Sequence, residues 1–351
     1  MNKRPSRRGD SKEAIIRTLL VDGNGLLKQS YNGAKHMYNS RGQHIGGLYQ
    51  FLTTLRKLIK ERSYHKVLVF WDGEFSGKLR NDVYPIYKET RNKDYVNGTK
   101  PVEEDYLLQR FKIDEYLDEL GIKQYSHPIV EADDLIAHYV KNNKFNEKIV
   151  ISTNDRDICQ LIDDNVILYL SDLKRYFDRS AFKKQFNYPS DNVKLIKILT
   201  GDTSDNIKGV ELIAQATLFK LFPEVKNDIL TVDDIIAKAK ILQNNRLESG
   251  KTRLKNLQNI IDGKTKGPQG DKLYEINDYI INLLNPLLTE DCINELDEII
   301  EEHLDMTDRK VENIYEKIIR DGLNESISSN YMVEYLLPYK EYNERYKKLI
   351  N

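Results

Sequence analysis

Three short apolar runs in the first half of the chain each end in aspartate, and this repeated pattern constrains the fold most. The runs RTLLVD, HKVLVFWD and EKIVISTND end at Asp22, Asp72 and Asp155. Runs of this length, bounded by glycine or polar residues, are typical of fully buried strands. We therefore expect these three aspartates to follow the carboxyl ends of three strands.

Helical patterns fill the segments between the runs. Apolar residues recur at helical spacing over 45–60, and a second helix over 102–120 closes at Gly121. A further helix is expected from Glu131, and NVILYL reads as a fourth strand, with DLKRYFD as a hairpin or edge. Strands that alternate with helices predict an α/β fold with a mostly parallel central sheet and helices on both faces.

More carboxylates belong to the same edge of this sheet, where ligands of such folds bind. The segment EADD adds Glu131, Asp133 and Asp134 after a predicted short strand, and Asp157 follows Asp155 closely. EADD alone also fits a helix capping box. The convergence of several strand ends favours a shared acidic site instead.

A glycine-flanked turn, GDTSDNIKGV, adds Asp202 and Asp205, which either cap a helix or complete the acidic site. So many carboxylates cannot all ionise in one cleft without cations. Because no Cys or His occurs in these motifs, the ligand set favours Mg²⁺ or Mn²⁺ over zinc. The candidate metal ligands are Asp22, Asp72, Glu131, Asp133, Asp134, Asp155, Asp157, Asp202 and Asp205. Two such ions would support hydrolysis of a phosphodiester.

Residues 76–100 combine basic and aromatic side chains with little apolar content, so we expect an exposed, mobile segment. This mixture suits single-stranded nucleic acid, although a solvated surface loop is the alternative. Lys88 and Arg91 are three residues apart, so one helical turn could aim both at a scissile phosphate. The candidate nucleic-acid contacts are Lys78, Arg80, Tyr84, Tyr87, Lys88, Arg91 and Lys93.

Composition excludes several other classes of protein. The 351 residues carry 54 Lys and Arg against 55 Asp and Glu, so a nucleic-acid binder would need segregated charges. No apolar run approaches the roughly 20 residues of a membrane span, and the basic N-terminus lacks a signal peptide's apolar core. Cys159 and Cys292 suggest neither a disulfide framework nor a zinc cluster. They fit a reducing compartment, so we expect a cytoplasmic protein, in the host cytoplasm if it is phage-encoded.

The motifs VDGN, FWDGE, YKETR, EADD, STNDRD and GDTSDNIKGV, in this order and spacing, resemble those of the flap endonuclease/5′-nuclease family. That family includes the 5′-nuclease domain of bacterial DNA polymerase I and bacteriophage 5′–3′ exonucleases and ribonucleases H. The resemblance covers about residues 17–220. It implies a two-metal 5′-nuclease that cuts DNA or RNA/DNA with single-stranded 5′ ends or flaps, as in primer removal during replication.

The resemblance also implies roles for individual residues. One metal would be held mainly by Asp22, Asp72 and the Glu131/Asp133 pair, and the second would lie nearer Asp155, Asp157 and Asp202. Asp134 matches a frequent third acid of the helix, unless it is the cap, and Asp205 matches the G-D-x-x-D-N motif. Lys88 and Arg91 match the lysine and arginine of the family's helical arch, and Tyr87 an aromatic able to stack on a base.

The sequence departs from the family after Gly209-Val210, where a glycine-rich hairpin usually approaches duplex phosphates. Leu212 and Ala214 replace the glycines, and a Cβ there hinders both positive φ and close approach. The resemblance therefore gives only weak support for duplex anchoring or a bound K⁺ at this hairpin. The predicted organisation is a flexible basic arm (1–14), a PIN-like core (15–200, arch about 76–100), a degenerate helix-hairpin-helix-like segment (201–222) and a helical region (223–351).

Two alternatives stay open. One is a catalytically silent, structure-selective DNA-binding protein of the same fold, which would have no need of costly carboxylates beside anionic DNA. The other is a PIN-type ribonuclease, which is shorter and lacks both the arch and the G-D-x-x-D-N segment. We expect a monomer without membrane contact; replication proteins are compatible partners, but no motif identifies one.

Overall fold

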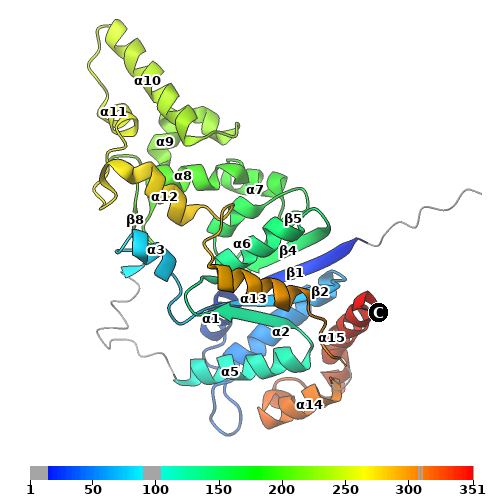
Figure 1. Ribbon diagram of the computed structural model, residues 1–351. Coiled ribbons are helices and arrows are strands. Elements are labelled where there is room, and N and C mark those ends of the chain that lie inside the picture. Colours follow the sequence, from blue (N-terminus) through cyan, green and yellow to red (C-terminus); the bar gives the residue numbers. More distant parts are fainter. Residues whose placement is uncertain (1–14, 90–103, 307–308, 310, 351) are drawn as a thin grey trace, which may run out of the picture.

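One six-stranded sheet forms the centre of the computed structural model, which describes residues 15–89, 104–306, 309 and 311–350 (Figure 1). Its strands are β1 Ile16–Asp22, β2 Lys66–Asp72, β3 Lys123–His127, β4 Glu147–Thr153, β5 Val166–Leu170 and β6 Arg175–Phe177. They lie in the order β3-β2-β1-β4-β5-β6, and all neighbours pair in parallel except β6, which is antiparallel to β5. The predicted α/β class with a mostly parallel sheet is confirmed.

The alternation of side chains along the strands divides the apolar residues between two cores. In β1, Leu19 and Val21 belong to one core and Leu20 to the other, and all three are fully buried. Val69 and Phe70 of β2 divide in the same way. Because both faces of the sheet are covered, the strands read as continuous apolar runs in the sequence.

Helices cover both faces. Five of them pack into the core that contains Leu19: α1 Gly23–Gly33, α2 Gly46–Glu61, α5 Glu104–Glu119, α14 Val311–Arg320 and α15 Ser329–Ile350. Three others pack into the core that contains Leu20: α6 Ala132–Asn143, α7 Arg179–Phe186 and α13 Glu290–Glu301. Among the described helices, none is both long and apolar enough to cross a bilayer.

A third core lies beyond the sheet and is largely helical. It joins α8 Val193–Thr200, α9 Gln215–Leu221, α10 Val232–Glu248, α11 Lys255–Ile261 and α12 Leu273–Ile281. The short antiparallel strands β7 Gly201–Asp202 and β8 Ile207–Lys208 lie between α8 and α9. In Figure 1, α10 and α11 extend away from the central sheet. The 3₁₀ helices are η1 Asp157–Leu161, η2 Ser190–Asn192, η3 Pro223–Lys226, η4 Gly270–Lys272 and η5 Leu323–Glu325.

The described part of the predicted arch, residues 76–89, packs partly against the helices beside it, although several of its side chains are exposed. It contains α3 Lys78–Val83, and Tyr84 and Tyr87 join an apolar cluster with residues of α8, β8 and α12. Arg80, Tyr84 and Tyr87 are each less than 5% exposed. The expectation of an exposed segment is therefore wrong for these three residues.

The hairpin after Gly209-Val210 keeps a left-handed residue despite lacking the expected glycine. Leu212 has φ 68° and is half exposed. A neighbouring loop supports it, because Glu211 N–H donates to Lys264 O (2.8 Å) and Thr265 Oγ1 donates to Gly209 O (2.9 Å). A Cβ hinders positive φ here without preventing it, since surrounding hydrogen bonds impose the turn at a cost in strain.

Replacing Leu212 with glycine should stabilise the protein. A left-handed L-residue costs about 1–2 kcal/mol, and glycine's extra freedom in the unfolded chain returns part of that gain. We expect Leu212→Gly to raise the free energy of unfolding by about 0.5–1 kcal/mol in urea titrations. The matched control is Ala214→Gly, whose extended backbone (φ −92°) needs no glycine and should lose stability. A Leu212→Gly variant less stable than the wild type would show that the left-handed backbone at Leu212 is not strained.

Candidate metal centre

Strands β1, β2 and β4 deliver Asp22, Asp72 and Asp155 to one edge of the sheet, as predicted. Asp22 closes β1, where its Oδ1 accepts from Gly25 N–H (2.8 Å) and its Oδ2 from Thr153 Oγ1 (3.0 Å). A Cβ on Gly25 would lie 2.2 Å from Asp22 Oδ2, so only glycine allows this close approach. The turn after β1 thereby fixes the direction of the first carboxylate.

Asp72 positions the helix that carries the next acids. Its Oδ1 accepts from Ala132 N–H (2.8 Å) at the start of α6, and its own N–H donates to Asn24 Oδ1 (3.0 Å). A carboxylate at a helix N-terminus is stabilised by unpaired N–H groups and the helix dipole. Asp133, in the first turn of α6, is thus held beside the strand ends.

The electrostatics show that these acids face one another. Burial, followed by the charges of Asp155, Asp22, Asp72 and Glu131, holds the pKa of Asp133 well above its usual range. Burial, opposed by the bond from Gly25 and reinforced by the charges of Asp72 and Asp155, raises the pKa of Asp22 to about 6. The first carboxylate group is defined as Asp22, Asp72, Glu131, Asp133 and Asp155.

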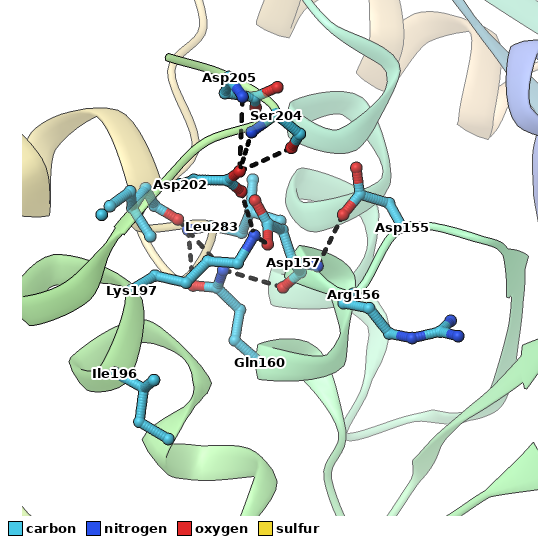
Figure 2. Close-up of polar contacts among 12 residues, drawn as sticks. Asp155, Arg156, Asp157, Gln160, Ile196, Lys197, Asp202, Ser204, Asp205 and Leu283 are labelled. Atoms are coloured by element: carbon cyan, nitrogen blue, oxygen red, sulfur yellow. Dashed lines mark hydrogen bonds and ion pairs between the residues drawn. The ribbon is translucent and has the colours of Figure 1, made fainter. Parts of the chain in front are cut away.

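A second carboxylate group consists of Asp157, Asp202 and Asp205 (Figure 2), and one oxygen of each lies within 4.8 Å of one oxygen of the other two. Lys197 Nζ forms ion pairs with Asp157 and with Asp202 (2.6 Å). Although burial opposes it, the Lys197 ammonium and two bonds from Ser204 lower the pKa of Asp202 to about 2. Lys197 supplies the positive charge that this group requires, and it is absent from the residues predicted from the sequence.

Lys88 touches both groups. Its Nζ lies 2.6 Å from Glu131 Oε1, and its N–H donates to Asp205 O (2.9 Å). Tyr87 donates to Glu131 Oε2 (3.0 Å). Despite the burial of Glu131, the charges of Lys88 and Arg80 lower its pKa. Lys88 adopts φ 53°, an uncommon value for lysine that places both its backbone and its side chain at the site.

Asp134 and Arg80 form a buried ion pair, a contact that the sequence does not predict. Arg80 Nη1 and Nη2 donate to Asp134 at 2.5 and 3.0 Å, and both side chains are at most 5% exposed. In this structure the pair occupies the Asp134 carboxylate and the Arg80 guanidinium, the groups predicted to bind a metal and a nucleic-acid strand. The capping-box interpretation is wrong, since Glu131 stands at the N-cap without a side-chain bond to the helix.

Burial also prevents Tyr84 and Tyr87 from stacking on a base in this structure. Tyr84 donates to Asn206 O (3.1 Å) and Tyr87 to Glu131, so both serve internal contacts. Lys78 is exposed, and its pairing with Asp82 (2.8 Å) leaves its predicted role untested. Arg91 and Lys93 lie outside the described residues, as do 1–14 and the remainder of the arch.

The residues of both groups fit divalent cations. Their ligand atoms are carboxylate oxygens, the set preferred by Mg²⁺ and Mn²⁺. Burial raises the pKa values of Asp22 and Asp133, and repulsion from the neighbouring carboxylates raises them further. A cation would relieve this repulsion.

Comparisons with known proteins point to one family. Residues 17–187 match the family described as "5'-3' exonuclease, N-terminal resolvase-like domain". A 5′–3′ exonuclease of Mycoplasmopsis pulmonis is 30% identical over 250 residues, which are 69% of this chain and 79% of the relative. The thermostable DNA polymerase I of Thermus caldophilus is 33% identical over 209 residues, which are 59% of this chain and 24% of the polymerase. The chain thus spans about a quarter of the polymerase's length.

A solved structure supports the same fold. The flap endonuclease of bacteriophage T5, in a pseudo-enzyme-product complex with DNA and metal ions, has a TM-score of 0.62. The match covers 81% of this chain and 98% of that chain, at 21% identity. It therefore includes more of the chain than residues 17–187, extending the likeness in fold beyond the matched family segment.

Removing one carboxylate should stabilise the metal-free protein. A carboxyl whose pKa is raised in the folded state binds more protons there than in the unfolded chain, so stability falls as pH rises above the unfolded pKa, near 4. Asp133→Asn removes this penalty. We expect about 0.5–2 kcal/mol more stability than the wild type at pH 8 in EDTA, a gap that narrows toward pH 4.

Urea titrations at several pH values measure this difference. Asp163→Asn is the control, because Lys144 pairs with Asp163 (2.9 Å) and the pKa of that carboxyl is lowered. This control should not gain stability at pH 8. An Asp133→Asn variant less stable than the wild type at pH 8 would show that Asp133 carries no electrostatic penalty.

Proposed function

Because the chain belongs to the 5′–3′ exonuclease family, we propose that it hydrolyses phosphodiesters with two divalent cations, Mg²⁺ or Mn²⁺. Family membership confirms the resemblance predicted from the motifs, and members of this family are phosphodiesterases. The proposed substrates are DNA or RNA/DNA with single-stranded 5′ ends or flaps. The number and identity of the metals belong to this proposal.

The observation that carries the proposal is the convergence of Asp22, Asp72, Asp133 and Asp155, with the pKa of Asp133 raised by burial and by the neighbouring charges. A protein that only binds anionic DNA has no use for uncompensated carboxylates beside it. This argues against the catalytically silent alternative. A bound cation pair would instead turn the arrangement into a binding site for a phosphate and its attacking water.

The residues of the chain have distinct parts in this proposal. Asp22, Asp72, Glu131, Asp133 and Asp155 would hold one cation, and Asp157, Asp202 and Asp205 would hold or orient the second. Bound cations would supply an activated water and stabilise charge on the leaving oxygen.

The two lysines would change partners when cations and substrate bind. Lys88 Nζ lies within hydrogen-bond distance of Glu131, at the rim of the first group. With a cation held at Glu131, the Lys88 ammonium would be able to donate to a phosphate oxygen, where the transition state is most anionic. Lys197 would be released from Asp157 and Asp202 in the same way.

The proposed biological setting follows from the relatives. The polymerase match supports removal of primers or flaps during replication, and the T5 complex contains DNA and metal ions. Cys159 and Cys292 are free and buried, which supports a reducing, cytoplasmic location. We propose that the chain acts as a monomer, in the host cytoplasm if it is phage-encoded.

Asp155→Asn should abolish cleavage and spare binding. The amide keeps the shape of the side chain and its acceptor oxygen but removes a charge needed for the cation, so we expect a loss of about 100-fold or more. A labelled 5′-flap DNA measures cleavage with Mg²⁺ and with EDTA, and gel shift in EDTA measures binding. Asp172→Asn is the control, since Asp172 pairs with Arg156 at the surface (2.6 Å).

The possible results separate the functions. Unchanged cleavage by Asp155→Asn would place the site elsewhere. Absence of metal-dependent cleavage by the wild type would favour the silent binding protein.

Lys88→Ala should reduce kcat far more than binding, because its ammonium acts at the transition state. Lys78→Ala is the matched control, an exposed lysine in the same segment, and it should change cleavage and binding together by no more than about threefold. Single-turnover rates and equilibrium binding to the flap substrate measure the two effects. Equal losses of cleavage and binding in Lys88→Ala would show that Lys88 only contacts a phosphate and has no separate effect on the transition state.

A further inference from the structure

Residues 280–287, here called the strap, join the end of α12 to the loop before α13. Ile280, Ile281 and Leu283 of the strap line one pocket together with acids of both carboxylate groups, namely Glu131, Asp133, Asp157 and Asp205. The strap begins about 100 residues beyond the family segment 17–187, in the region that the sequence predicts only to be helical. Four hydrogen bonds nevertheless connect it to side chains at the metal centre. Through these bonds, the C-terminal region contacts residues that adjoin the carboxylate groups.

The two ends of the strap hold the ion pair beside Glu131. Arg80 Nε donates to Ile280 O (2.8 Å), and Leu287 N–H donates to Asp134 Oδ1 (2.9 Å). Arg80 Nη1 also lies 3.3 Å from Glu131 Oε2. The strap thus fixes both partners of the Arg80–Asp134 pair, and the pair in turn sets the position of Glu131 in the first group.

Gln160 binds the middle of the strap through hydrogen bonds. Its Oε1 accepts from Leu283 N–H (2.9 Å), and its Nε2 donates to Ile281 O (3.1 Å). The same Nε2 donates to Asp157 O (2.9 Å), so one buried amide joins the strap to the backbone of a second-group acid. Figure 2 shows Gln160 between Leu283 and Asp157. Gln160 is only 5% exposed.

Such contacts act on geometry rather than on charge. Gln160 is neutral, and within the described part of the chain its side chain is bonded to backbone groups, so its effect on Asp157 passes through the peptide backbone. Groups that orient metal ligands from behind typically change metal affinity by 10- to 100-fold when they are removed. Asp157 is especially sensitive, because repulsion from Asp202 and Asp205 would displace a carboxylate whose backbone was not held.

We propose that the strap is a positioning element of the metal centre and that Gln160 is a positioning residue for Asp157. Together with the Arg80–Asp134 pair, the strap sets the spacing between the two carboxylate groups. The proposal rests on the metal dependence proposed above and extends it to residues outside the matched family segment. It predicts that cation affinity depends on a neutral side chain that binds no cation.

The test is Gln160→Met, which keeps the length of the side chain and removes all three hydrogen bonds. Calorimetric titration with Mn²⁺, without substrate, should show affinity reduced by about 10-fold or more. Thermal unfolding of the metal-free protein is measured in parallel, because buried partners left unpaired also reduce stability.

Gln243→Met is the matched control. Gln243 is 3% exposed, and its side chain also binds both polar groups of a backbone segment. It accepts from Leu254 N–H (2.9 Å) and donates to Leu254 O (3.2 Å). It lies in α10, outside both carboxylate groups. We expect a comparable loss of thermal stability with Mn²⁺ affinity unchanged within about twofold.

Arg80→Lys provides a second, independent variant. It preserves the positive charge but loses the bidentate pairing with Asp134 and the bond to Ile280. A weaker Mn²⁺ affinity would therefore result from the changed positions of the ligands and not from a changed charge.

Mn²⁺ affinity equal to wild type in both Gln160→Met and Arg80→Lys would overturn the proposal. Equal losses of affinity in Gln160→Met and Gln243→Met would overturn it too, by showing a general effect of destabilisation. Absence of Mn²⁺ binding by the wild type would instead overturn the proposed function itself.

Discussion

Mutual repulsion among carboxylates at one edge of the sheet is the constraint on which the surrounding structure depends. Asp22, Asp72 and Asp155 are brought there by parallel strands that share a direction, and Asp133 joins them from α6. Burial, reinforced by the charges of Asp72 and Asp155, raises the pKa of Asp22 to about 6, so its ionised form is less stable in the folded chain than it would be in water. The neighbouring elements can be understood as means of holding these charges in place.

Three kinds of contact do so. Backbone N–H groups at Gly25 and Ala132 bind Asp22 and Asp72, while lysine ammonium groups neutralise Glu131 and the second group. The Arg80–Asp134 pair and Gln160 then join the acids to the strap. A site of this kind lowers the stability of the metal-free protein and is suited to bind cations, a compromise common at functional sites.

The sequence was sufficient to predict the sheet and most of the acids that converge on it. Short apolar runs of strand length, each followed by aspartate, carry that information locally. The Arg80–Asp134 pair could not be predicted in this way, because a charged residue reads as exposed until its partner, 54 residues away in the chain, is known to be buried beside it. The burial of Tyr84 and Tyr87 could not be predicted for the same reason, since their apolar neighbours come from elements distant in the chain. The role of Gln160 could not be predicted from the sequence, because it depends on hydrogen bonds to backbone groups that are distant in the chain.

Anomalous diffraction from a crystal soaked in Mn²⁺ tests the central claim most directly. The account predicts two peaks, one among Asp22, Asp72, Glu131, Asp133 and Asp155 and one near Asp157, Asp202 and Asp205. It also predicts that Lys88 Nζ and Lys197 Nζ move away from the carboxylates they now pair with. No peak at this edge of the sheet, with both lysines still paired, would contradict it.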